Sequence, residues 1–322
     1  MLAGVLFGML VYVGMAVWAD AGAVADALAR IPLWVVPACC GLSFANYLVR
    51  FVKWRRYLAL LGTPLEPKTS FLVYLSGLSM SVTPGKMGEV FKCWLIKKVR
   101  GTPIHQTAPI VVAERFTDLL GYLILMAIGG IRTMPEHAWV FWTTLGVCAV
   151  ALVLAGSRTF ANLAAGLFKR LPWVWRLVPR IEGSFASTRI LLAPREIFMP
   201  TLVSVVGWGL ECTGFWLIAN AGSQTSVPYL YAVFAYAFSA VAGALLIIFP
   251  GGLGVTEFSM GKLLVDRYQE AGALALKAAQ QQATGVVILA RFCTLWFAVL
   301  VGFVATGLFT RLHGRIEAEE SR

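Results

Sequence analysis

Two distant stretches of the chain place a glutamate beside a proline–glycine break in an otherwise apolar sequence. The residues concerned are Pro84, Gly85, Gly88 and Glu89 in the first stretch, and Pro250, Gly251, Gly252, Gly254 and Glu257 in the second. Further along, an arginine lies inside an apolar run in each case, Arg115 after the first break and Arg291 after the second. Guanidinium groups match phosphate oxygens well. The pattern therefore indicates a site for a phosphate-bearing group, and its repetition indicates a transporter built from duplicated segments.

Further charged residues lie in the same kind of apolar run. Asp118 follows Arg115 by three residues and shares its helix face, and Glu211 lies in the middle of another run. Each such charge costs roughly 2.5–3.5 kcal/mol at the centre of a bilayer. We therefore expect these side chains to face protein, water or one another. A polar pathway through the membrane and a static network of ion pairs both satisfy that requirement.

The breaks themselves favour a cavity. Proline and glycine interrupt a helix and leave backbone groups without partners, and at membrane depth such groups must line a cavity or be covered by protein. A helix beginning after the first break points its positive end at that break, which favours an anion there. Lys86 and Lys92 add positive charge. We therefore expect a wet, positively charged cavity.

The composition is that of a membrane protein. The chain has 322 residues, of which 59% are hydrophobic, and its mean hydropathy is +0.76. The formal net charge of +11 does not indicate nucleic-acid binding, because the basic residues lie in short loops beside apolar runs. The six cysteines lie mostly in apolar runs without a C-x-x-C pair, so we expect neither disulfides nor a metal site, and no cofactor.

We expect an all-α polytopic membrane protein. Apolar runs of roughly 20 residues predict six full transmembrane helices, and two shorter runs, each ending at a break, predict broken or re-entrant segments. The six full spans are expected near 2–19, 32–52, 107–131, 138–157, 197–220 and 282–310, and the shorter runs are 69–83 and 229–249. The second short run is also long enough for a plain crossing of the bilayer.

Loop charges orient these spans. Basic residues follow the span 32–52, the first break and the span 138–157, and they recur in the tail. Such loops face the cytoplasm. The topology closes if the two short runs enter the membrane from opposite sides, which gives two inverted repeats and places both termini in the cytoplasm of a bacterium or archaeon.

The single domain 1–322 then divides in order along the chain. The expected parts are a leading helix with an outer loop (1–31), repeat A (32–131), a linking helix with a cytoplasmic amphipathic loop (132–196), repeat B (197–310) and a cytoplasmic tail (311–322). In the loop 158–196, basic and aromatic residues alternate, which suits a helix lying among anionic headgroups. Residues 32–131 and 197–310 are called segment A and segment B below.

Several of these motifs resemble the transmembrane flippase domain of the lysylphosphatidylglycerol synthase family. The matching residues are Arg55, Arg56, Tyr57 and Leu58 before Gly62, the first break with Lys92, Glu114, Arg115, Phe116 and Asp118, the string from Pro250 to Glu257, and Arg291. The resemblance covers roughly 40 to 310. It implies a polytopic protein that moves lipids or lipid-linked intermediates between leaflets. In bifunctional members this domain is fused to a soluble aminoacyl transferase, whereas only 311–322 follow the last span here, so we expect no synthase activity.

The leading hypothesis is a flippase for a phospholipid or a lipid-linked glycolipid. Arg115 and Arg291 would bind a phosphate, and Glu89, Glu257, Glu211 and Asp118 would balance the arginines, carry a coupling proton or contact an amine. Lys86, Arg55 and Arg56 would collect headgroups at the cytoplasmic mouth. A membrane-embedded transferase acting on a lipid phosphate and a non-transporting scaffold of a lipid-synthesis complex remain alternatives. The expected partner is a membrane lipid, with a homodimer as one arrangement of the chain.

Overall fold

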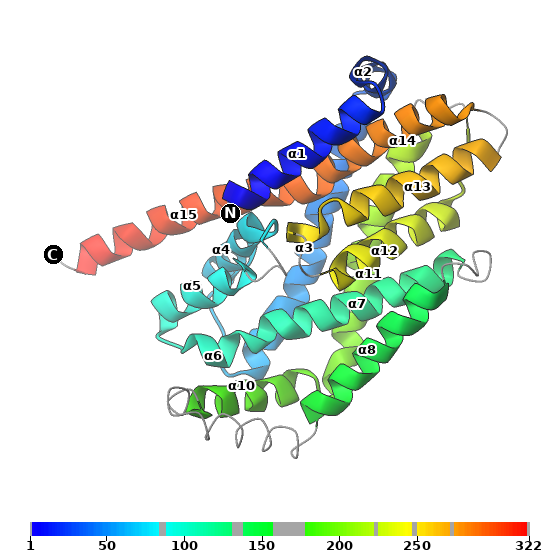
Figure 1. The fold of residues 1–322 in the computed structure, drawn as a ribbon. Helices are drawn as coiled ribbons and strands as arrows, with labels where there is room; N and C mark the ends of the chain where they lie inside the picture. Colours follow the sequence, from blue (N-terminus) through cyan, green and yellow to red (C-terminus); the bar gives the residue numbers. More distant parts are fainter. Residues whose placement is uncertain are drawn as a thin grey trace.

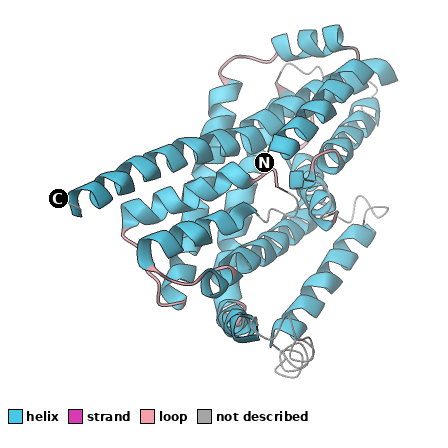
Figure 2. Cartoon of the chain, turned by 60° about the vertical axis from the view of Figure 1, so that its left-hand side comes forward, coloured by secondary structure: helices cyan, strands magenta, loops and turns pink. Residues whose placement is uncertain are grey.

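The fold comes from a computed structural model, and the structure describes residues 2–83, 88–130, 138–156, 178–221, 225–246, 250–270 and 274–320. Within these ranges the regular structure is entirely helical (Figures 1 and 2). The expected all-α architecture is therefore confirmed for this part of the chain.

The helices of the first half and the link follow one another with short connections. They are α1 (Leu2–Trp18), α2 (Ala21–Ala29), α3 (Val35–Leu60), α4 (Pro67–Ser76), the 3-10 turn η1 (Gly77–Met80), α5 (Phe91–Arg100), α6 (Ile104–Thr107), α7 (Pro109–Gly129), α8 (Ala138–Gly156) and α10 (Val178–Leu191). The second half contains α11 (Pro194–Asn220), α12 (Tyr229–Leu245), the 3-10 turn η5 (Pro250–Gly252), α13 (Val255–Glu270), α14 (Leu276–Arg291), the π-helical turn η6 (Phe292–Trp296) and α15 (Phe297–Glu320).

Three helices are long and apolar enough to cross a bilayer. They are α3, α11 and the continuous helix Leu276–Leu312, which joins α14, η6 and α15. The pair α1–α2, bent by 96°, adds a fourth if it forms one span. Each of the six ranges expected as full spans contains a helix in its described residues, but α7 contains Glu114, Arg115 and Asp118. The number of crossings therefore remains a prediction.

Helix α3 extends beyond the range 32–52 that its apolar run predicts. It continues to Leu60 because Trp54, Tyr57 and Leu58 pack into the core, and Gly62 with a φ of +65° follows its end. The basic residues from Lys53 to Arg56 therefore lie within a helix, where the charge pattern had predicted a loop.

Both short runs end as short helices before their breaks, as expected. In the first, α4 ends at Ser76 and passes into η1, which ends at Met80. Thr83 follows, and its Oγ1 accepts a hydrogen bond from the Gly88 N–H at 2.9 Å. The residues 84–87, with Pro84, Gly85 and Lys86, lie outside the described part of the chain. In the second, Gly251, Gly252 and Gly254 all have φ between +62° and +88°, a conformation that glycine adopts readily.

The second break touches the residues that come just before the first. A Cβ atom added to Gly251 would lie 3.1 Å from the carbonyl oxygen of Ser81 and 3.5 Å from the Cα of Val82. Regions separated by about half of the chain therefore meet backbone to backbone, and glycine permits the approach.

Segments A and B also pack reciprocally. Helix α3 of segment A packs along α11 of segment B, α12 packs on α7, and η1 with α4 packs on α15. Glycines lie at the closest points: a Cβ on Gly129 of α7 would lie 2.6 Å from the Phe234 nitrogen of α12, and a Cβ on Gly302 of α15 would lie 2.1 Å from the Ser79 nitrogen of η1. The broken run of each segment thus rests on the last long helix of the other segment.

Only part of the loop expected to be amphipathic is described. Residues 158–177 lie outside the described ranges, whereas α10 packs against α6 and α7. In Figure 1, α10 lies below α6 at the lower edge of the bundle.

Candidate functional site

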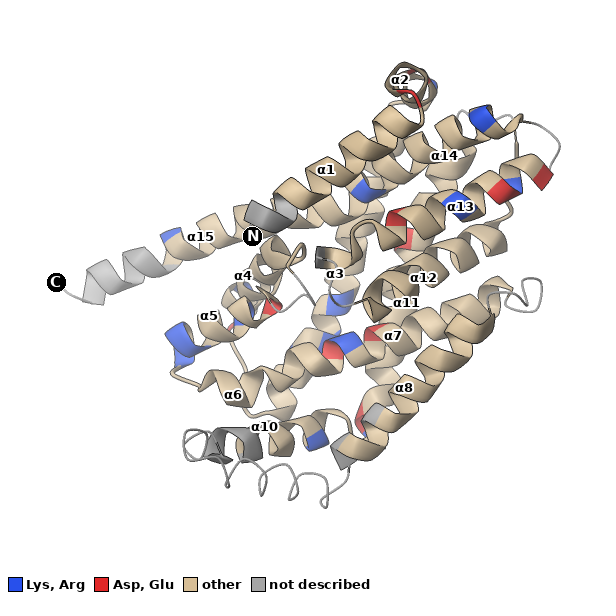
Figure 3. Ribbon diagram, viewed as in Figure 1, with Lys and Arg blue, Asp and Glu red and all other residues tan. Residues whose placement is uncertain are grey.

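A cavity of about 320 Å³ lies where the two segments meet. Ser81 and Glu89, which flank the first break, and Gly251 and Gly252 of the second break contribute to its wall. The charged residues that line it are Arg50, Glu89, Arg115, Asp118, Glu211 and Arg291, and the aromatic ones are Tyr47, Tyr122, Trp208 and Tyr236. Figure 3 shows that the middle of α7 carries acidic and basic residues within a helix whose remaining residues are uncharged.

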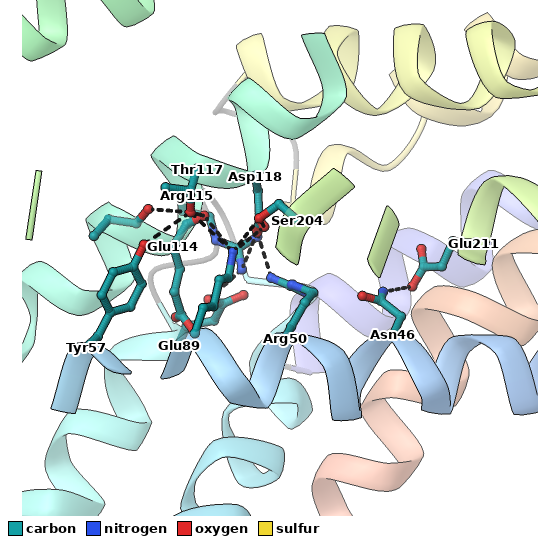
Figure 4. Close-up of polar contacts among 12 residues, drawn as sticks. Asn46, Arg50, Tyr57, Glu89, Glu114, Arg115, Thr117, Asp118, Ser204 and Glu211 are labelled. Atoms are coloured by element: carbon teal, nitrogen blue, oxygen red, sulfur yellow. Dashed lines mark hydrogen bonds and ion pairs between the residues drawn. The ribbon is translucent and has the colours of Figure 1, made fainter. Parts of the chain in front are cut away.

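Asp118 is the centre of the polar network on the segment A side. Its Oδ2 accepts from Arg50 Nη2 at 2.6 Å and pairs with Arg115 Nη2 at 3.5 Å. Its Oδ1 accepts from Lys53 Nζ at 2.6 Å and from Ser204 Oγ at 2.9 Å. Figure 4 shows Arg50 of α3 reaching Asp118 of α7, with Arg115 and Ser204 beside it. One buried carboxylate therefore holds three cations, one of which, Lys53, is fully buried.

Two further carboxylates hold the other side of this network. Arg115 Nη2 lies 3.1 Å from Glu89 Oε2. Lys92 donates to Glu114 and lies 3.9 Å from Glu89. The Lys92 ammonium also lies 4.8 Å from the centre of the Trp54 ring, a cation–π contact. Lys92 is therefore held inside the protein and does not line the cavity.

The equivalent arginine of segment B has a simpler environment. Arg291 Nε donates to Glu257 Oε1 at 2.5 Å, and its Nη2 donates to the Gly251 carbonyl at 3.5 Å. The other oxygen of Glu257 accepts from the Gly254 N–H at 2.6 Å, which caps the first turn of α13. Tyr12 of α1 adds a hydroxyl 3.4 Å from Glu257.

Glu211 lines the cavity from α11 and is nearly completely buried. It accepts from Asn46 Nδ2 at 2.6 Å and from the Tyr236 hydroxyl at 2.5 Å. Asn46 lies one helical turn from Arg50 on α3. The contact between α3 and α11 is close here, because a Cβ on Gly207 would lie 2.5 Å from Asn46 Oδ1.

Comparison with known proteins shows the family of this chain. The profile of the family described as "Lysylphosphatidylglycerol synthase TM region" matches residues 2–302. The chain belongs to this family. A curated relative is the UPF0104 membrane protein PH1989 of Pyrococcus horikoshii, which is 24% identical over 290 residues, covering 80% of this chain and 82% of the relative. The expected family is confirmed, and the chain is a helical membrane protein.

The structure brings several of the expected site residues together around the cavity. The described residues of that set that line the cavity are Arg115, Arg291, Glu89, Asp118, Glu211, Gly251 and Gly252. Lys92 and Glu257 lie directly behind this wall, bound to Glu114 and Arg291. Arg115 and Asp118, expected on one helix face, lie 3.5 Å apart and form an ion pair.

Two expected residues lie elsewhere. Arg55 is exposed on α3, and Arg56 pairs with Glu196 of α11, with 37% and 24% of the two side chains exposed. Neither lines the cavity. Arg55 points away from the interior because it follows the buried Lys53 by two residues along a helix, which places it on another face. Arg56 lies one turn beyond Lys53, and its guanidinium is held by Glu196 instead of reaching the cavity.

The expected positive cavity is wrong for the described residues. Its wall contains three guanidinium groups and three carboxylates, so the formal charges balance. The expected positive charge depended on Lys86 and Lys92. Lys86 lies outside the described residues, and Lys92 is paired with Glu114 behind the wall.

Sequence reasoning missed the contribution of α3. Asn46, Arg50, Lys53 and Tyr57 are spaced by four, three and four residues, which places them on one helix face. That spacing could have revealed a polar stripe facing the interior. It was hidden because Lys53 was assigned to a cytoplasmic loop, and because Arg50 lies close to the end of the apolar run.

Proposed function

We propose that this protein moves a phosphate-bearing lipid headgroup from one leaflet of the membrane to the other. The observation that carries the proposal is the cavity itself. It lies between segments A and B, residues that flank the first break and residues of the second break line it, and so do charges of both signs. Such a cavity offers a headgroup an alternative to crossing hydrocarbon, while the acyl or prenyl chains remain in the bilayer.

The reciprocal packing supports an arrangement of inverted repeats. A pseudo-two-fold axis would relate α3 to α11, α4 with η1 to α12, and α7 to the helix formed by α14, η6 and α15. The contacts of α12 with α7 and of η1 with α15 would then be copies of one contact. In transporters of this type, access alternates when one repeat rocks against the other.

The ion pairs suggest how a headgroup would be accommodated. A guanidinium bound to a carboxylate can release it and bind a phosphate oxygen, and the carboxylate can then accept from a neighbouring cation. The network around Asp118 has such spare partners. The protein would lie in the cytoplasmic membrane with both termini in the cytoplasm, as the basic loops predict.

Transport is favoured over the transferase alternative. A general base needs access to the proton it removes. The candidate bases, Glu89 and Glu257, are both held in ion pairs. Glu89 pairs with Arg115 and Lys92, and Glu257 pairs with Arg291 and accepts from the Gly254 N–H. Ion pairing of this kind suits binding and release of a charged group better than proton abstraction.

A liposome assay tests the proposal. The full chain is reconstituted into vesicles that carry fluorescent lipids with several headgroups, and the fraction accessible to a membrane-impermeant quencher is followed over time. We expect leaflet exchange faster than in empty vesicles. The variant Lys262→Gln, which changes an exposed surface pair with Asp266, should exchange lipid at the wild-type rate. Exchange no faster than in empty vesicles for every headgroup would contradict the proposal.

A further inference from the structure

We propose that Arg50, Arg115 and Trp208 form the oxyanion-binding site of the cavity, and that Arg291 is not part of it. This inference rests on the proposed function, since it specifies which residues of the same cavity recognise the headgroup. It differs from the symmetrical expectation, in which Arg115 and Arg291 would share a phosphate.

Three hydrogen-bond donors in the described part of the cavity wall lack an acceptor. They are Nε of Arg50, Nε of Arg115 and Nε1 of Trp208, and each atom is buried. The Arg50 side chain is 6% exposed and Trp208 is 7% exposed. Buried polar groups normally have partners, so donors of three residues around one cavity indicate a ligand that supplies acceptors.

The three groups adjoin one another. Arg50 and Arg115 both direct Nη2 to the same oxygen of Asp118, so their guanidinium groups lie side by side. The Arg50 guanidinium carbon lies 4.5 Å from the centre of the Trp208 ring. A small anion could therefore contact all three residues at once, and it would relieve the repulsion between the two adjacent guanidinium groups.

The surroundings of Trp208 indicate recognition through its N–H. The ring packs under Arg50 and stacks on Tyr122 at a centroid distance of 4.8 Å. These contacts use the face of the indole, so the ring is not available as a stacking platform for a sugar. The Nε1 donor remains, and an indole N–H donates only.

The local charge also favours an anion. Among the described residues, the network around Asp118 contains four basic side chains and three acidic ones. The basic residues are Arg50, Lys53, Lys92 and Arg115, and the acidic residues are Glu89, Glu114 and Asp118. One anion would balance this set.

Arg291 does not fit this role. Its Nε, the atom that is unpartnered in Arg50 and Arg115, donates to Glu257 at 2.5 Å, and Glu257 is also fixed by the backbone of Gly254. A ligand would have to displace that carboxylate. The ligand class is therefore a phosphate monoester or diester held on the segment A side, and a lipid that lacks phosphate should not bind.

Binding to the purified full chain in detergent tests the inference. The probes are dioctanoyl phosphatidylglycerol, dioctanoylglycerol and inorganic phosphate, and the affinities are measured by isothermal titration calorimetry. We expect the phospholipid to bind and dioctanoylglycerol not to bind. Competition by inorganic phosphate would show that the oxyanion alone is recognised, whereas binding of the lipid alone would show that the site needs a headgroup attached to a chain. Both results support the site.

Two conservative variants test which residues form the oxyanion-binding site. Trp208→Phe keeps the ring and removes the N–H, and Arg50→Lys keeps the charge beside Asp118 and removes Nε. Each should weaken phospholipid binding at least about tenfold, as expected for loss of a hydrogen bond to a charged group. Trp216→Phe on the same helix is the matched control, because its N–H donates to the Val227 carbonyl outside the cavity.

The same variants distinguish a failure of the oxyanion-binding site from a failure of the proposed transport. If Trp208→Phe and Arg50→Lys bind the phospholipid as tightly as the wild type, or if dioctanoylglycerol binds equally well, the site is wrong even where liposomes show lipid exchange. If the wild type binds the phospholipid through these residues and liposomes show no exchange, the site stands and the proposed transport fails. Should one variant unfold on purification, the other decides the question.

Discussion

The two break-and-arginine motifs are alike in sequence but their arginines have different surroundings. Arg115 shares Glu89 and Asp118 with other cations, and 27% of its side chain is exposed. Arg291 has one carboxylate partner, Glu257, and only 10% of its side chain is exposed. The same residue type thus takes part in an adaptable network in segment A and in a closed pair in segment B. We infer that the first binds a ligand and the second stabilises the fold.

The cause of this difference lies on the neighbouring helices. In segment A, α3 supplies Arg50 and Lys53 to Asp118, so cations outnumber carboxylates around Arg115. In segment B, Glu257 is fixed by Gly254 at the start of α13 before it meets Arg291. A motif therefore does not determine its role without the helices packed against it.

Loss of the Asp118 charge should have the largest effect. The variant Asp118→Asn leaves Arg50 and Lys53 buried without their carboxylate, and breaking a buried pair in this way costs about 3–5 kcal/mol. The measurement is the free energy of unfolding from a denaturant titration in detergent. Asp266→Asn, which removes an exposed pair with Lys262, is the control and should cost about 0–1 kcal/mol. Equal stability of the two variants would mean that the network around Asp118 is not structural.

Breaking the closed pair of segment B should rank second. In Glu257→Gln the amide keeps one acceptor for the Gly254 N–H but loses the charge beside Arg291. We expect a loss of stability of about 3 kcal/mol, the lower end for a buried pair, because Arg291 still donates to the Gly251 carbonyl. Glu270→Gln, at an exposed position, is the matched control. A Glu257 variant as stable as this control would contradict the view that the ion pair between Arg291 and Glu257 stabilises the fold.

The packing of the broken run of segment A on segment B can be tested at a glycine. Gly302→Ala places a methyl group against the backbone of Ser79, and overpacking of this kind costs about 1–3 kcal/mol. Gly307→Ala on the same helix meets open space and should be neutral or stabilising by up to about 1 kcal/mol, since alanine favours the helix. The midpoints of thermal unfolding in detergent compare the two. A midpoint for the Gly302 variant as high as that of the Gly307 variant would show that helix propensity, not contact with η1, controls this site.

Arg115→Lys should have the smallest effect on stability and a clear effect on transport. The partly exposed ion pairs of Arg115 contribute about 0–1 kcal/mol, whereas a lysine cannot present the paired donors that match a phosphate. We expect lipid exchange in liposomes about tenfold slower with stability nearly unchanged. Arg267→Lys is the control, because Arg267 has the same exposed fraction of 27% but lies outside the cavity. Equal exchange rates in the two variants would remove Arg115 from the binding site.

The sequence was sufficient to predict the elements that depend on local rules. Apolar runs predicted the helices, since burial in a bilayer requires them, and proline with glycine predicted the two interruptions. The pairing of Arg115 with Asp118 also followed from spacing along one helix. These features involve residues that are close in the chain.

The partners of charges across the fold could not be predicted in this way. Lys53 reads as the start of a basic loop, and its burial depends on Asp118, which lies 65 residues away. The same holds for the ion pair between Arg291 and Glu257 and for the contact between Gly251 and Ser81. Both depend on segments that meet only in the folded chain. The sequence shows that a buried charge needs a counterion, but not which residue supplies it.

The π-helical turn η6 has a consequence for the longest helix. It directly follows Arg291, which must reach the second break, and it precedes Gly302, which must face Ser79. Deleting one residue from a helix rotates everything beyond it by about 100°. Shortening this turn by one residue would therefore rotate Gly302 away from η1. The helix Leu276–Leu312 would then no longer make the contact with η1 and the contact between Arg291 and Gly251 at the same time. The extra residue in the turn sets the rotation between Arg291 and Gly302 about the helix axis, which allows one continuous helix to make both contacts.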